Sequence, residues 1–108
     1  MRYGMDIDKL AKLVADDFKE AMKENGFETF KEMKDCYWWT AQDIRDEISY
    51  IAQTLINDEY KKDLEEYGGW ENIPYTARCY VDDFGNVVEY ESREVKYGQF
   101  KKMVMSHL

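Results

Sequence analysis

Cysteine, proline and histidine are scarce in this chain, whose 108 residues include two Cys, one Pro and one His. Cys36 and Cys79 stand 43 positions apart and form no Cys-x-x-Cys pair, so neither a disulfide framework nor a zinc cluster is indicated. His107 lies next to the last residue, so no Ser-His-Asp or Cys-His catalytic group has a well-held base. We therefore expect reduced thiols and a protein that is not an enzyme and needs no cofactor.

Long apolar runs and nucleotide or metal signatures are also missing. No apolar run reaches the roughly 18 residues that a membrane-spanning helix needs. The opening Met-Arg-Tyr-Gly-Met-Asp has no apolar region of a secretion signal, so we expect a cytoplasmic protein. No glycine-rich phosphate loop, HExxH, GxSxG or EF-hand pattern occurs, which excludes the common nucleotide, zinc-protease, esterase and calcium sites.

Negative charge dominates the composition, with 23 Asp+Glu against 15 Lys+Arg and a formal net charge of -8. This balance disfavours direct binding to nucleic acid or to an anionic membrane. Hydrophobic residues make up 44% and aromatic residues 16% of the chain. That content is sufficient for one domain, residues 1–108, which buries roughly two thirds of its extended-chain surface around an aromatic-rich core.

The first predicted helix covers residues 6–25, where apolar side chains recur at the spacing of one helix face. Asp6 can cap its start, and Asn25-Gly26 provides the left-handed residue that ends it. The apolar stripe consists of Ile7, Leu10, Ala11, Val14, Phe18, Ala21 and Met22.

A short second helix is predicted over about 30–37, because Thr29 and Glu32 have the spacing of a capping box. In that motif, each side chain accepts a hydrogen bond from the other residue's backbone N–H. The side chains expected to face inward are Phe27, Phe30, Met33 and Tyr37.

The third predicted helix is the longest and runs from Thr40, which stands three positions before Asp43, to Gly68-Gly69. A bend is expected near Asn57-Asp58. Its apolar stripe consists of Ala41, Ile44, Ile48, Ile51, Ala52, Leu55 and Ile56, continued by Tyr60, Leu64 and Tyr67.

After Gly69 the apolar period changes from that of a helix to that of a strand. Residues 75–82 alternate, 83–86 supply turn residues, and 87–93 read as the return strand of a β-hairpin. This loop places Val81 opposite Val88, Cys79 opposite Tyr90 and Tyr80 opposite Glu89. A short helix is predicted after Gly98, at the end of the chain. The predicted fold class is α+β, with three main helices packed on a β-hairpin and a short C-terminal helix.

Acidic side chains are concentrated in residues 36–74, which carry nine Asp and Glu against three Lys and Arg. A helix face of this kind attracts basic partners, and repeated carboxylates resemble a phosphate backbone to a nucleic-acid-binding protein. The alternative is that this acidic helix face is only hydrated and keeps the domain soluble. The residues of the predicted face are Asp43, Asp46, Glu47, Asp58, Glu59, Asp63, Glu65 and Glu66.

Two consecutive tryptophans, Trp38 and Trp39, precede the long helix. Neighbouring helical residues point about 100° apart, so both indoles cannot face one core from a helix. Tryptophan is a preferred anchor of protein interfaces, and we expect the pair to flank the acidic face in a binding site. The alternative is that both indoles cover the core at the helix junction.

The leading hypothesis is a non-enzymatic, acidic protein-binding module whose partner has a basic surface. If that partner binds nucleic acid, the chain is an inhibitor or nucleic-acid mimic, similar in size and charge to the anti-CRISPR proteins of phages and mobile elements. One alternative is a structural homodimer without a separate partner. A second is a small metal-dependent enzyme in which Asp43, Asp46 and Glu47 share a cation such as Mg²⁺.

Overall fold

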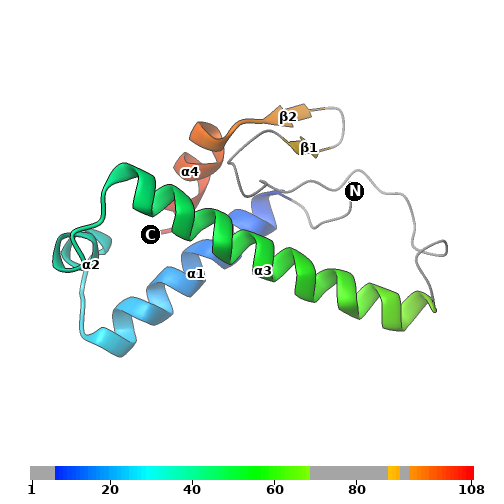
Figure 1. The fold of residues 1–108 in the computed structure, drawn as a ribbon, viewed down its shortest axis with the longest axis horizontal. Helices are drawn as coiled ribbons and strands as arrows, with labels where there is room; N and C mark the ends of the chain where they lie inside the picture. The colour runs from blue at the N-terminus through cyan, green and yellow to red at the C-terminus, as the bar shows by residue number, and fades with distance from the viewer. Residues whose placement is uncertain (1–6, 69–87, 91–92) are drawn as a thin grey trace.

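The computed structural model describes residues 7–68, 88–90 and 93–108 (Figure 1). In Figure 1, α2 joins α1 to α3 at one end of the molecule, and α3 crosses α1. No helix in the described ranges is long and apolar enough to span a membrane. The elements are α1 (Ile7–Asn25), α2 (Phe30–Cys36), α3 (Ala41–Tyr67), β1 (Val88–Tyr90), β2 (Arg93–Val95) and α4 (Tyr97–Ser106).

Several of the predicted helix caps are present in the described residues. α1 ends before Gly26, which has a φ of 76°, whereas Asp6 lies outside the described residues. The Thr29 hydroxyl accepts the backbone N–H of Glu32 at 3.2 Å, as predicted. The Glu32 carboxylate, however, accepts the N–H of Glu28, not that of Thr29.

The long helix α3 begins with a complete capping box and continues unbroken through Asn57-Asp58. Asp43 donates its backbone N–H to the Thr40 hydroxyl, and the Asp43 carboxylate accepts the Thr40 N–H. At the other end, Gly68 has a φ of 76° and donates its N–H to the Leu64 carbonyl. These local hydrogen bonds set the length of α3 to 27 residues.

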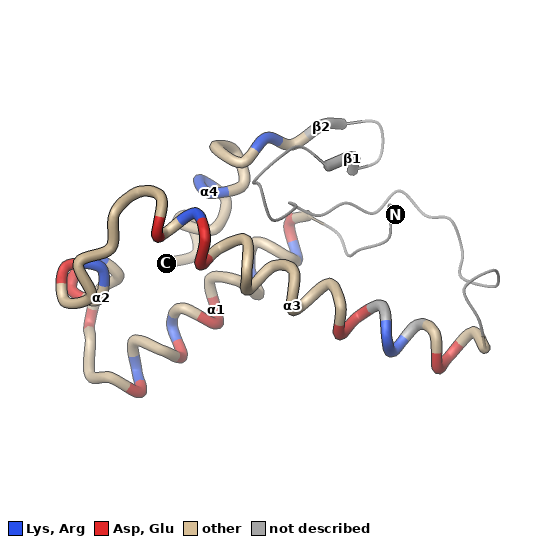
Figure 2. Tube along the Cα trace, viewed as in Figure 1, with Lys and Arg blue, Asp and Glu red and all other residues tan. Residues whose placement is uncertain are grey.

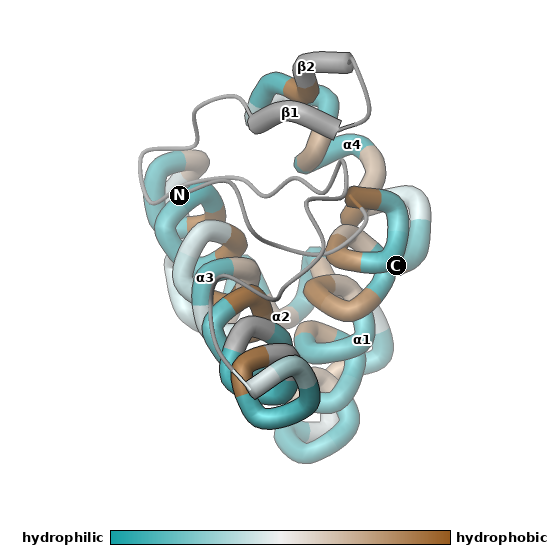
Figure 3. The backbone as a smooth tube through the Cα atoms, turned by 90° about the vertical axis from the view of Figure 1, so that its right-hand side faces the viewer, coloured by the Kyte–Doolittle hydropathy of each residue, from teal (hydrophilic) through white to brown (hydrophobic). Residues whose placement is uncertain are grey.

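The core lies around α1, which packs against α2, α3 and α4. Hydrophobic stretches of α1 and α3 turn toward each other (Figure 3). The buried apolar residues are Ile7, Leu10, Ala11, Val14, Ala15, Phe18, Met22, Met33, Ile44, Ile48, Ala52, Ile56, Val95, Phe100 and Val104.

Most of the predicted inward-facing residues belong to this core or pack against it, with exceptions at the helix ends. Tyr37 is 46% exposed, Tyr67 is 40% exposed and Ala41 is exposed, so these three predictions are wrong. Tyr67 is the last residue of α3. Tyr37 follows the last residue of α2, and Ala41 is the first residue of α3, where the helix has not yet reached the core. The C-terminal helix begins at Tyr97, earlier than predicted, and Leu108 lies beyond it and is exposed.

The α+β fold class is wrong for the described part of the chain, which is essentially helical. Its helices have 19, 7, 27 and 10 residues, whereas the two strands have three residues each. Val95, at the end of β2, is buried, and the other buried apolar residues given above lie in helices. Facing helices therefore form most of the described core, to which β2 contributes Val95.

The predicted return strand over 87–93 is also wrong, because the chain reverses within it. β1 pairs with β2 in an antiparallel register that places Val88 opposite Val95, Glu89 opposite Glu94 and Tyr90 opposite Arg93. The predicted first strand (75–82) and turn (83–86) lie outside the described residues, and so does the predicted pairing across them.

Candidate functional site

The connection between α2 and α3 places a tryptophan where a helix end normally has glycine. Trp38 donates its N–H to the Asp35 carbonyl at 3.3 Å, and Trp39 donates its N–H to the Lys34 carbonyl at 3.0 Å. This pair of bonds is the Schellman motif, whose left-handed residue is usually glycine. Trp38 occupies that position with a φ of 59°, the one positive φ of a non-glycine residue in the described ranges.

The end of α1 provides a comparison within the same molecule. There Gly26 donates to the Lys23 carbonyl and Phe27 donates to the Met22 carbonyl, which is the same hydrogen-bond pattern. Gly26 has a φ of 76°. An L-residue in this conformation costs about 1 to 2 kcal/mol, because its Cβ crowds the following carbonyl. Trp38 carries that cost, whereas Gly26 does not.

The left-handed turn separates the two tryptophans. The Trp38 side chain is 87% exposed. Trp39 is half-buried, with its ring centroid 6.2 Å from those of both Phe18 and Phe30 and 5.5 Å from that of Tyr37, on which it stacks. One indole is therefore presented to solvent while its neighbour is held by the aromatic part of the core.

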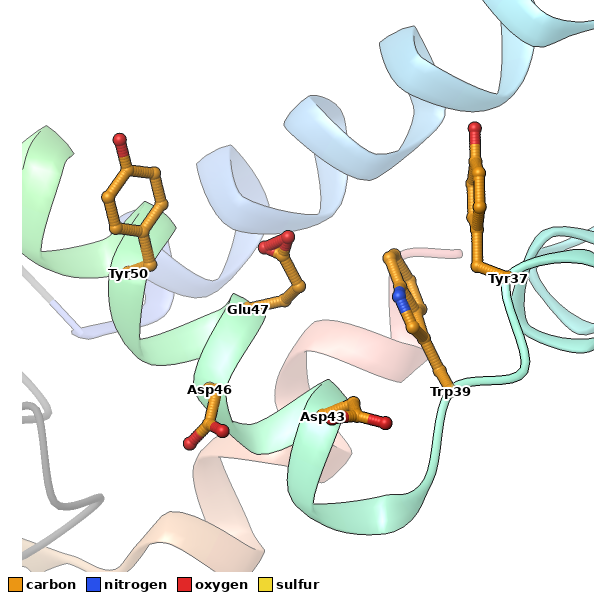
Figure 4. A pocket seen from close by; sticks show the side chains of 6 residues that line it. All are labelled: Tyr37, Trp39, Asp43, Asp46, Glu47 and Tyr50. Carbon is orange, nitrogen blue, oxygen red and sulfur yellow. The ribbon is translucent and has the colours of Figure 1, made fainter.

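Beside Trp39 lies an open hollow of about 490 Å³ (Figure 4). Successive helical residues are about 100° apart, so the four lining residues of α3 fall within about 100° of each other, on the side away from Ile48. In Figure 4, Glu47 lies between Tyr50 and Trp39. The lining residues are Tyr37, Trp39, Asp43, Asp46, Glu47 and Tyr50.

The three carboxylates of this hollow differ in how they are bonded. Asp43 accepts the Thr40 N–H at 2.8 Å and the Thr40 hydroxyl at 3.0 Å, and these hydrogen bonds lower the pKa of Asp43. Asp46 accepts from the Gln42 side-chain amide at 2.9 Å, and in Figure 4 its carboxylate points away from Glu47. Glu47 is half-buried and has no hydrogen-bond or ion-pair partner within the described ranges.

Arg45 is the basic residue closest in sequence to these three carboxylates, but its side chain contacts α4. Its guanidinium lies 4.7 Å from the ring centroid of Tyr97 in α4, a cation–π contact. At 100° per residue, Arg45 projects from the side of α3 roughly opposite the hollow. The residues that line the hollow therefore include neither Arg45 nor any other lysine or arginine.

The predicted acidic face separates into two groups along α3. Positions 48–57 carry no charged side chain, a gap that corresponds to about 16 Å of helix between Glu47 and Asp58. In the second half of α3, acidic residues alternate with Lys61 and Lys62 (Figure 2). There Asp58, Glu65 and Glu66 are exposed, Glu59 is half-buried, and the side chain of Asp63 is not among those described.

The structure thus brings Trp39, Asp43, Asp46 and Glu47 together, with Trp38 next to them in sequence, and leaves the second acidic group apart. Sequence reasoning did not identify Tyr37 and Tyr50 as parts of this surface. Tyr50 could have been found, because it stands three positions after Glu47 on the face opposite the apolar stripe. Nothing in the sequence indicated that Tyr37 would be exposed.

Other candidate chemistry finds no geometric support in the described ranges. No group of three or more His, Cys, Asp or Glu side chains there is arranged to hold a metal ion. Cys36 is exposed and free, whereas Cys79 lies outside the described residues. His107 is exposed at the end of α4.

No family model matches the chain, and neither the curated proteins nor the solved structures include a match to it.

Proposed function

We propose that this protein is a non-enzymatic binding module that uses the α2–α3 junction to bind a protein partner with a basic surface. We call this the junction surface; it consists of Tyr37, Trp38, Trp39, Asp43, Asp46, Glu47 and Tyr50. The observation that carries the proposal is Trp38, which is held in a strained backbone conformation and is 87% exposed. Residues held in strained backbone conformations cluster at functional sites, where the function offsets the cost in stability.

The other residues of the junction surface have the composition of an interface centre. Tyr50 is 70% exposed and Tyr37 is 46% exposed. Tyrosine and tryptophan contribute disproportionately to binding free energy, because they bury a large rigid area and have a polar end. The carboxylates beside them favour a partner of positive charge and accelerate its association.

The spacing of the charges favours a compact contact over a continuous phosphate-like row. Asp58, Glu65 and Glu66 lie beyond the uncharged positions 48–57, so salt largely screens their attraction for a group bound at the junction surface. A nucleic-acid-binding protein remains one class of partner with a basic surface, and competition with DNA tests that narrower hypothesis.

Affinity capture from a lysate of the source cells tests the proposal. We expect one protein to be captured by the wild type and lost with Trp38→Ala and with the double variant Asp46→Lys/Glu47→Lys. The matched control is Glu65→Lys/Glu66→Lys, which makes the same charge change on exposed residues of the same helix. Asp43 is left unchanged in both variants, so that the helix cap stays intact.

The control variant shows whether capture of the partner depends on the junction surface or only on the net charge of the protein. Equal loss of the partner with both double variants would show that net charge alone drives capture, and the proposal would be wrong. The proposal also fails if nothing but the chain itself is recovered and light scattering shows a dimer that Trp38→Ala disrupts. That result would assign the junction surface to self-association. Release of the partner by competing DNA would identify it as a nucleic-acid-binding protein.

A further inference from the structure

From the geometry of the hollow in the junction surface, we infer that it receives one arginine side chain of the partner protein. This inference rests on the proposed function and adds the chemical identity of the group that is recognised. Three features support it: a supported aromatic wall, a carboxylate without a partner in the described ranges, and a lining that contains no lysine or arginine.

The aromatic wall is held in place from behind. Tyr37 and Trp39 stack with an interplanar angle of 30°, and Trp39 contacts Phe18 edge-on at an interplanar angle of 64°. Phe18 is buried in α1, so the indole is fixed by the core. A guanidinium is planar and stacks on such a ring face by cation–π attraction.

Glu47 supplies the acceptor for the same group. It lies between Tyr50 and Trp39 in Figure 4 and is half-buried without a partner in the described ranges. A guanidinium donates in a fork that matches the two oxygens of a carboxylate, so one arginine can stack on the wall and bond Glu47 at once. Asp43 and Asp46 add negative charge nearby, although one oxygen of each already accepts hydrogen bonds within the chain.

Arginine fits this hollow better than lysine. The hollow is open to solvent, and an ammonium group holds its water more strongly than a guanidinium does. The positive end of the α3 dipole opposes any cation near its first turn, but Asp43 in that turn offsets the effect. The chain makes the same kind of contact internally, where Arg45 stacks over Tyr97.

The test is a titration of the ¹⁵N-labelled full chain with three small probes: the N-acetyl methylamides of arginine, lysine and citrulline. Citrulline has the shape of arginine without its charge. The signal followed is the indole N–H of Trp39, assigned from its loss in Trp39→Phe. We expect a saturable shift with the arginine probe, with a dissociation constant of about 1 mM or weaker. The lysine probe should bind about fivefold more weakly, and the citrulline probe should not saturate.

Variants of two glutamates on α3 complete the experiment. Glu47→Gln should weaken the arginine probe about tenfold, because it removes the charged acceptor. Glu65→Gln, which changes an exposed glutamate of the same helix, should leave binding unchanged. Citrulline binding equal to arginine, or an unchanged affinity in Glu47→Gln, would overturn the inference. The titration needs no partner, so its failure while capture still depends on Trp38 would reject the arginine assignment and leave the proposed function standing.

Discussion

At the scale of single residues, two helix ends with the same hydrogen bonds carry different residues at the left-handed position. Gly26 ends α1 and Trp38 ends α2. A Cβ added at Gly26 would meet no atom within 4 Å, so backbone conformation alone accounts for the cost of a side chain there. Trp38 gains no burial in return, since it is 87% exposed. Its identity is therefore better explained by binding than by folding.

Introducing glycine at position 38 and removing it from position 26 should change the free energy of unfolding in opposite directions. We expect Trp38→Gly to raise the free energy of unfolding by about 1 kcal/mol, because it relieves the positive φ. Gly26→Ala should lower it by about 1 kcal/mol. Urea unfolding followed by circular dichroism measures both, with Trp38→Ala as the control that removes the indole and keeps the strain. If Trp38→Gly is no more stable than Trp38→Ala, the backbone at this position is not strained.

At the scale of elements, side-chain caps define where the helices begin, and one of them adjoins the junction surface. The Asp43 carboxylate is part of the α3 capping box and also lines the hollow. Hydrogen bonds from the Thr40 backbone N–H and hydroxyl lower the pKa of Asp43 below its ordinary value of 3.8. The ionised carboxylate therefore stabilises the folded state more than the protonated one does.

This pKa shift makes the contribution of the cap depend on pH. Because the pKa of Asp43 is lower in the folded than in the unfolded chain, its stabilising effect is fully present above pH 3.8 and is lost as the pH falls through the folded value. Asp43→Asn should therefore be less stable than the wild type at pH 6, and the difference should disappear toward lower pH. Thermal unfolding across this range measures it, and Glu65→Gln controls for the loss of one negative charge from α3. If the difference in stability between Asp43→Asn and the wild type persists at the lowest pH, packing and not the charge of Asp43 causes it.

The sequence was sufficient for the helices because their signals are local. Thr29, Thr40 and Gly68 each stand within four residues of the backbone groups that they satisfy. It was insufficient for the strands, because the prediction relied on the turn residues at 83–86 to pair 75–82 with 87–93, whereas β1 pairs with β2. The sequence pattern indicated the carboxylates and Trp39 of the hollow, but not Tyr37 and Tyr50. A left-handed tryptophan has no signal in sequence, since glycine is the expected residue.

At the scale of the whole molecule, the junction surface is connected to the core through rings. Phe18 in α1 lies 5.3 Å from Phe30 and 6.2 Å from Trp39, measured between ring centroids, and Trp39 stacks on Tyr37. Phe27 adds an edge contact to Tyr37 at 5.9 Å. Because α1 also packs against α3 and α4, the helix that organises the core also supports the wall of the hollow.

Because these rings connect the core to the hollow, we predict that a substitution of Phe18 weakens binding, whereas the same substitution of a buried phenylalanine outside the ring cluster does not. Phe18→Leu should lower the free energy of unfolding by about 1 kcal/mol and also weaken arginine-probe binding, because Trp39 loses the ring that holds it. Phe100→Leu is the matched control, since Phe100 is also fully buried but lies in α4, outside this ring cluster. It should cost similar stability and leave probe binding unchanged. Urea unfolding and the Trp39 indole titration measure the two effects separately. Equal weakening of binding by both variants would mean that general loss of stability affects the hollow, and that Phe18 has no specific role in holding its wall.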